Sequence, residues 1–129
     1  MVKVLNMTFD TENGQNNINA LNLIELNAHS NDKITDVSFM KSLKILNASW
    51  GCEINQNGIK NLNLEELNIN NNKKITNVSF MTSLKKLHIG HNCGVNQNRI
   101  KGLELNTLNI NYNYGIYNVS FIKSPMYHL

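Results

Sequence analysis

The sequence repeats at an interval of 41 residues, and this repeat constrains the fold more than any other feature. The tripeptide Val-Ser-Phe recurs at positions 37–39, 78–80 and 119–121. Each 41-residue unit divides again into two segments that begin alike, as in LKILNASWGC and LEELNINNNK. A chain of this kind is expected to stack its units into a solenoid, because one unit alone cannot bury its apolar face. The same interval separates Cys52 from Cys93 and relates Gln15, Gln56 and Gln97.

Six segments of 20 or 21 residues can be aligned over the 129-residue chain. Apolar and polar residues alternate at the start of each segment, as around Leu64, Leu67 and Ile69, which predicts a short strand with one buried face. Stacking such strands at about 4.8 Å gives a parallel sheet in which leucine lies on leucine. We therefore predict one domain, residues 1–129, with six coils. The coils start at Val2, Leu23, Leu43, Leu64, Leu84 and Leu105.

The segments share the pattern L-x-x-L-x-L-x-x-N, which resembles that of the leucine-rich-repeat superfamily over nearly the whole chain. The resemblance implies an α/β solenoid with a parallel sheet on its concave face and short helical or 3-10 turns on its convex side. The first half of each unit is similar to the cysteine-containing repeats, which carry a short outer helical turn, and the second half to the short internalin-type repeats. The alternation and the asparagine content together look like the asparagine-rich leucine-rich-repeat proteins of large DNA viruses of amoebae.

Asparagine accounts for 26 of the 129 residues. Asparagine-rich tracts can be disordered, but 15 Leu and 13 Ile are spread evenly through the chain, which excludes that interpretation. A side-chain amide carries both donor and acceptor groups, so it can satisfy backbone groups of a buried turn in its own coil and in the next. We expect such a ladder after the strands, interrupted at Gly51. Its positions are Asp10, Asn31, Gly51, Asn72, Asn92 and Asn113.

Charge and hydropathy exclude several classes of protein. The net charge of +3 is too small to favour a nucleic-acid partner. No apolar run approaches the ~20 residues that cross a bilayer, and the N-terminal MVKVLNMTFD cannot form the apolar core of a secretory signal. We therefore expect a cytoplasmic protein without a membrane partner. Residues 67–129 carry seven basic residues and one acidic residue, and a polyanion could bind there through Lys73, Lys74, Lys85, Lys86, Arg99 and Lys101.

Catalytic and metal-binding motifs are not evident. The sequence contains no recognisable acid pair, nucleophile elbow or glycine-rich phosphate loop, so we expect no enzyme activity and no cofactor. His88, His91 and Cys93 are close in sequence, but Cys93 should face the core while His88 faces outward, which argues against a metal site. Cys52 and Cys93 should lie two coils and about 10 Å apart, beyond the roughly 7 Å that a disulfide spans. We expect two buried, reduced thiols.

The outward-facing strand residues form the face on which leucine-rich-repeat proteins usually bind their partners. Large side chains at the strand ends, such as Trp50 and Tyr112, are typical of binding hot spots, although they could instead act as local lids over the strands. The asparagine columns could bind a partner through their amides or bond to one another along the stack, which is the favoured interpretation. The predicted partner-binding residues are Phe9, His29, Trp50, Asn68, Asn70, His88, His91, Asn109, Asn111 and Tyr112.

Neither end of the chain shows an obvious capping repeat. Pro125 lacks the donor that a further strand needs, so we expect it to stop the sheet and residues 123–129 to form a short lid. The uncapped N-terminal strand would favour a homodimer or end-to-end stacking.

These features predict a non-catalytic module that binds a protein partner on its concave face. The viral resemblance implies a host protein as that partner, in the host cytoplasm. The alternatives are a structural or self-assembling repeat protein that stacks through its ends, and binding of a polyanion by the basic C-terminal half.

Overall fold

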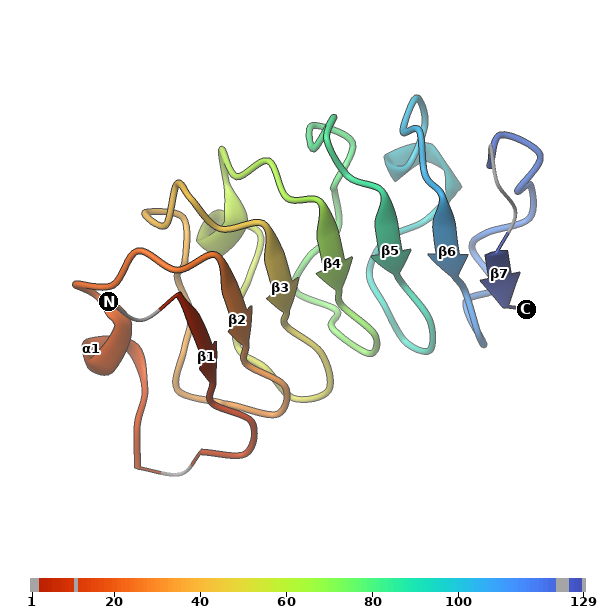
Figure 1. Ribbon diagram of the computed structural model, residues 1–129. Helices are drawn as coiled ribbons and strands as arrows, with labels where there is room; N and C mark the ends of the chain where they lie inside the picture. Colours follow the sequence, from red (N-terminus) through yellow and green to blue (C-terminus); the bar gives the residue numbers. More distant parts are fainter. Residues whose placement is uncertain (1–2, 11, 123–125, 129) are drawn as a thin grey trace.

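The computed structural model describes residues 3–10, 12–122 and 126–128, the last three by their backbone alone. Seven parallel strands follow one another in chain order in a single sheet (Figure 1). The predicted solenoid is therefore confirmed, with one strand more than expected. The strands are β1 (Val4–Asn6), β2 (Glu25–Asn27), β3 (Ile45–Asn47), β4 (Glu66–Asn68), β5 (Lys86–His88), β6 (Thr107–Asn109) and β7 (Met126–His128).

The strands pair in the register that the leucine pattern predicts. Leu26 lies beside Leu46, and Leu46 beside Leu67. From β2 to β6 the central leucine of each strand is no more than 1% exposed. The opposite wall completes the core with Ile18, Ile59 and Val78, which are fully buried. Phe80 remains 38% exposed, whereas the neighbouring Met81 is buried.

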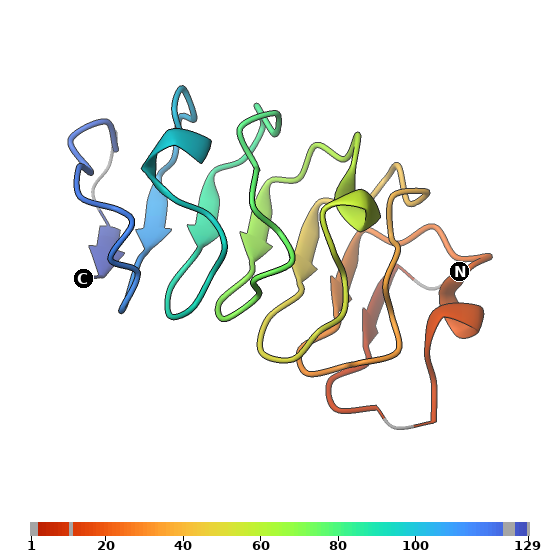
Figure 2. The same cartoon turned by 180° about the vertical axis from the view of Figure 1, so that it is seen from behind.

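The outer wall, seen in Figure 2, differs between the two halves of each 41-residue unit. Short helical turns occur in the first, third and fifth coils, as α1 (Gln15–Ile18), η1 (Asn57–Ile59) and η2 (Gln97–Arg99). In the described part of the chain the second, fourth and sixth coils contain none, which confirms the difference between the two kinds of segment. No helix among the described residues is long and apolar enough to cross a bilayer.

Three buried or partly buried asparagines form the predicted turn ladder, but only in every second coil. The Nδ2 group of Asn72 donates to the carbonyl oxygens of Ala48 and Ile54, at 2.8 and 3.1 Å, and its Oδ1 accepts from the backbone N–H of Lys74 at 2.9 Å. Asn31 and Asn113 make the same three bonds. The expectation that Asn92 belongs to this ladder is wrong, because its side chain is exposed.

Glutamine forms a second link between the same coils, on the outer wall. The side chain of Gln56 donates to the carbonyl oxygen of Asn77 at 2.8 Å and accepts from the backbone N–H groups of Thr76 and Asn77, at 2.8 and 2.9 Å. The asparagine link runs backward from coil four to coil three, while the glutamine link runs forward. Each 41-residue unit is therefore a pair of coils joined twice. The equivalent links come from Gln15 and Gln97.

The sheet does not stop at Pro125, contrary to the expectation from sequence. β7 pairs with β6 in parallel, with Leu108 beside Tyr127. The strand begins at the residue after the proline, so the missing proline N–H does not prevent pairing. Pro125 itself and the rest of the predicted lid at 123–124 and 129 lie outside the described residues, as does Val2.

Candidate functional site

The exposed face of the sheet carries a central column of polar residues, one from each strand. Asn68 and Asn109 are half-buried there, and His88 occupies the equivalent position in β5. The Oδ1 atom of each asparagine accepts a hydrogen bond from the backbone N–H two residues later. These bonds measure 3.0 Å at Asn68 and 3.1 Å at Asn109. The same bond is made by Asn6, Asn27 and Asn47.

This local bond determines which end of each amide is available to a ligand. Only the oxygen of a side-chain amide can accept a hydrogen bond from a backbone N–H, so the Nδ2 group remains available to donate to a ligand. Among the described residues, none of these column amides bonds to the amide of the neighbouring coil. The favoured interpretation, that the asparagines bond to one another along the stack, is therefore wrong for this column. The central column therefore presents hydrogen-bond donors, and we call it the donor column.

The next column toward the strand ends does contain bonds between coils. The Nδ1 atom of His29 lies 2.7 Å from the hydroxyl oxygen of Ser49, which in turn donates to Asn47. Because the serine proton is directed to Asn47, His29 donates through Nδ1. Ser49 is 1% exposed, so this arrangement does not present a nucleophile to solvent. In the same column Asn70 accepts from the backbone N–H of Gly90 at 2.7 Å, and Asn111 is half-buried.

In each of the six coils, the residue that follows the two polar columns at the end of the strand has a left-handed backbone. The φ angles are 44° at Trp50, 60° at His91 and 60° at Tyr112. This conformation suits glycine and asparagine, and it costs other residues about 1 kcal/mol or more. Bulky rings therefore occupy positions that the backbone alone does not favour. The same conformation is found at Phe9, Ser30 and Asn71.

Three of these rings lie together along the edge of the sheet. The ring centroids of Trp50 and His91 are 4.8 Å apart, although the two residues belong to coils three and five. His91 lies 5.3 Å from Tyr112. Tyr112 is 67% exposed and Trp50 40% exposed. We call Trp50, His91 and Tyr112 the ring cluster.

Phe9 lies apart from the ring cluster, in the first coil. Its ring packs edge-on against His29 at 5.3 Å and is 66% exposed. The predicted binding residues thus fall into two aromatic groups at the strand ends, with the donor column beside them. Sequence reasoning identified these positions but missed their left-handed backbone, because only Asn71 carries a residue typical of that conformation.

The two cysteines are unpaired thiols. Cys52 is buried and Cys93 only partly buried, so the expectation of two buried thiols is correct for the first alone. Burial raises the pKa of each thiol to about 11. Among the described residues, no three His, Cys, Asp or Glu side chains are grouped closely enough to hold a metal ion.

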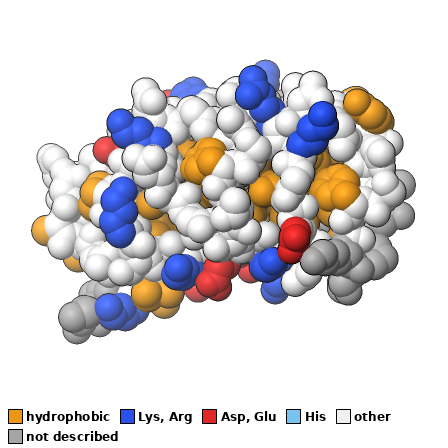
Figure 3. Space-filling view, turned by 90° about the horizontal axis from the view of Figure 1, so that it is seen from above, with side chains coloured by type: hydrophobic (Ala, Val, Ile, Leu, Met, Phe, Trp, Pro, Cys, Tyr) orange, Lys and Arg blue, Asp and Glu red, His pale blue; other side chains and the backbone are white. Residues whose placement is uncertain are grey.

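The basic residues of the C-terminal half do not form one surface. Lys86 lies on the sheet 3.9 Å from Glu66, and Lys74 lies 3.4 Å from Glu53. Arg99 belongs to η2 on the outer wall. Figure 3 views the molecule from the side on which the strands begin, and the Lys and Arg side chains there are scattered rather than gathered.

Comparison of the chain with models of known protein families, with curated protein sequences and with solved structures gave no match.

Proposed function

We propose that this protein is a non-catalytic interaction module that binds a protein partner on the exposed face of its sheet. The observation that carries the proposal is the ring cluster. Trp50, His91 and Tyr112 all occupy left-handed positions that favour smaller residues, and two of them remain substantially exposed. Residues that the fold does not favour at a position are candidates for function there.

The donor column defines the chemistry of the partner. The available Nδ2 groups of the half-buried Asn27, Asn47 and Asn68 follow one another at the strand spacing of about 4.8 Å. A partner segment that offers carbonyl or carboxylate oxygens at this face would match them. The rings would provide the apolar anchor beside these polar contacts, as at other protein interfaces.

The fold also supports assignment to the leucine-rich-repeat superfamily. The buried leucines lie at the positions that its pattern requires, and the turn asparagines Asn31 and Asn72 are buried. The narrower resemblance, to asparagine-rich proteins of large DNA viruses of amoebae, would make the partner a host protein and the site of action the host cytoplasm. The two unpaired thiols are compatible with that compartment.

Affinity capture from a host lysate tests the binding proposal. The double variant Trp50→Ala, Tyr112→Ala removes the two most exposed rings of the ring cluster. Tyr117→Ala is the matched control, because Tyr117 is 81% exposed and belongs to the turn that Gln97 contacts on the outer wall. A partner captured by the wild type and the control but lost by the double variant supports the proposal. A partner retained equally by all three proteins contradicts it.

End-to-end stacking is the second candidate. β1 is an edge strand of the sheet, and Val4 on it is 59% exposed. Exposed strand edges pair readily with other chains. Sedimentation velocity over a hundredfold range of concentration separates the two functions: a constant monomer contradicts stacking, and a concentration-dependent increase in mass supports it.

A further inference from the structure

The loops that follow β3 to β6 border two adjoining open hollows on the strand-end side of the solenoid. The first, of about 310 Å³, lies between coils three and five, and the second, of about 450 Å³, lies between coils four and six. Lys73 and Asn92 line both. The two hollows therefore adjoin at the turn containing Lys73, and we refer to them together as the groove.

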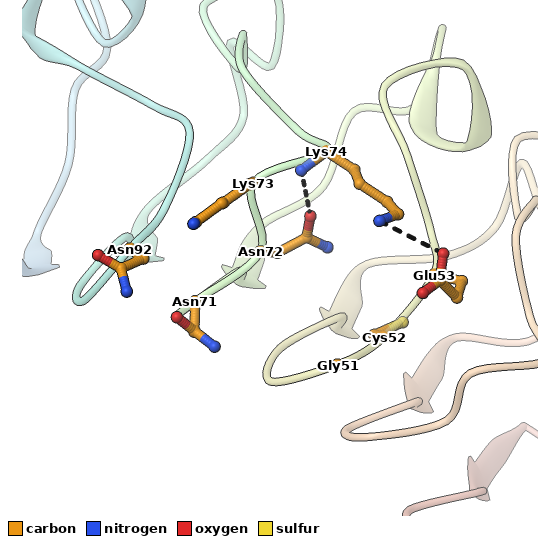
Figure 4. Close-up of a pocket in the computed structure, with 8 residues that line it drawn as sticks. All are labelled: Gly51, Cys52, Glu53, Asn71, Asn72, Lys73, Lys74 and Asn92. Carbon is orange, nitrogen blue, oxygen red and sulfur yellow. Dashed lines mark hydrogen bonds and ion pairs between the residues drawn. The ribbon is translucent and has the colours of Figure 1, made fainter.

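Lys73 is the uncompensated charge of this groove. Its neighbour Lys74 forms an ion pair with Glu53 at 3.4 Å. Figure 4 shows that Lys73 extends the opposite way, toward the loop that carries Asn92. Lys73 makes no hydrogen bond or ion pair with any described residue. The lining of the second hollow contains no Asp or Glu, so nothing there neutralises the ammonium group.

Further hydrogen-bond donors and aromatic rings surround the same hollow. The Oδ1 atom of Asn96 accepts from the backbone N–H of Asn98 at 3.2 Å, which leaves its Nδ2 group as the available end. Asn92 is exposed beside it. Tyr112 and Tyr114 line the far side and are 67% and 88% exposed. One cation, two amides and two phenol rings thus face a single space.

We propose that this second hollow binds an anionic group carried on a planar ring, with Lys73 contacting the anion and the two tyrosines contacting the ring. A phosphate or a carboxylate supplies the acceptor oxygens that an ammonium group and amides recognise. Offset or edge-on ring contacts with Tyr112 and Tyr114 add apolar contact area. The site shares His91 and Tyr112 with the ring cluster, but it does not depend on the partner-binding proposal.

The test uses phenyl phosphate as the probe and follows the backbone amides by ¹⁵N–¹H NMR. We expect saturable shifts at Lys73, Asn92 and Tyr114, and binding at least about fivefold tighter than that of inorganic phosphate or phenol, since each of these lacks one of the two contacts. Benzoate, titrated in parallel, shows whether the site prefers a phosphate or a carboxylate.

Two charge-matched variants complete the experiment. Lys73→Gln should weaken the binding of phenyl phosphate by about fivefold or more, because it removes the charge-assisted contact. Lys44→Gln changes the net charge equally at an exposed position outside the groove and should leave binding unchanged. The proposal is overturned if no saturable shift appears, if Lys73→Gln binds as tightly as the wild type, or if inorganic phosphate binds as tightly as phenyl phosphate.

Discussion

The side-chain amide of Asn72 donates a hydrogen bond to the carbonyl oxygen of Ala48, 24 residues earlier in the chain, at 2.8 Å. Ala48 directly follows β3 in one coil, and Asn72 lies in the turn of the next. The same separation of 24 residues joins Asn31 to Met7 and Asn113 to Ile89. This contact joins the two coils of each pair at the strand-end edge of the sheet.

Replacement of Asn72 by alanine should destabilise the fold markedly. The substitution leaves the carbonyl oxygens of Ala48 and Ile54 and the N–H of Lys74 without their partner. Because each unsatisfied buried polar group costs about 1–3 kcal/mol, we expect a loss of about 3 kcal/mol in the free energy of unfolding. Urea denaturation followed by circular dichroism measures it.

Asn92→Ala is the matched control for that experiment. Asn92 occupies the equivalent place in the fifth coil but is exposed, so its loss should change the free energy of unfolding by no more than about 0.5 kcal/mol. Equal losses in the two variants would show that the turn ladder does not alternate between coils.

Gly58 should tolerate no side chain. A Cβ atom built there would lie 2.1 Å from the carbonyl oxygen of Thr35 in the preceding coil, and that oxygen belongs to the backbone. Gly58→Ala must therefore push two coils apart, and we expect it to lower the free energy of unfolding by about 2 kcal/mol or more. The neighbouring Asn57 is exposed, and Asn57→Ala serves as the control. A Gly58→Ala variant as stable as that control would contradict the close approach of the coils.

The buried thiol of Cys52 should make the fold less stable in alkaline solution. Burial raises the pKa of Cys52 from 9.0 to about 11, so the unfolded chain releases this proton at a lower pH than the folded chain. The protonated Cys52 thiol contributes its full share to the free energy of unfolding below pH 9. This share, up to about 2 kcal/mol, is lost progressively as the pH rises toward 11.

Comparison of the wild type with Cys52→Ala isolates this effect from the titration of lysine and tyrosine. Urea denaturation midpoints of the two proteins, measured between pH 7 and 10.5, should converge above pH 9, because only the wild type loses the thiol contribution. Parallel curves over the whole range would exclude a raised pKa at Cys52.

The solenoid could be predicted from the sequence because its core depends on apolar periodicity. The positions of Leu46 and Leu67 in the strands follow from the repeat itself, and neighbouring strands have no other register that buries them. The alternation of the turn ladder had a usable signal as well. Asn31 and Asn72 recur 41 residues apart, whereas the intervening coils carry Gly51 and Asn92, which indicates that no single residue is required there.

The geometry of the candidate site could not be predicted in the same way. A left-handed backbone is normally signalled by glycine or asparagine, but Trp50 and Tyr112 give no such signal. The contact between Trp50 and His91 passes across an intervening coil and depends on side-chain directions. The roles of Gln56 and its equivalents were missed although their spacing was visible, because glutamine has no fixed place in the leucine pattern.

The central claim is that the rings at the strand ends serve binding rather than the stability of the fold. The most direct measurement is the free energy of unfolding of the combined variant Trp50→Asn, His91→Asn, Tyr112→Asn. Asparagine already occupies the equivalent position at Asn71, with a φ of 56°. Asparagine adopts the left-handed backbone more readily, which should stabilise each position by about 1 kcal/mol, and the loss of ring contacts should destabilise it by about the same amount. We therefore predict a free energy of unfolding within about 1 kcal/mol of the wild type. A loss of more than about 3 kcal/mol would show that the rings are structural lids and would contradict the account.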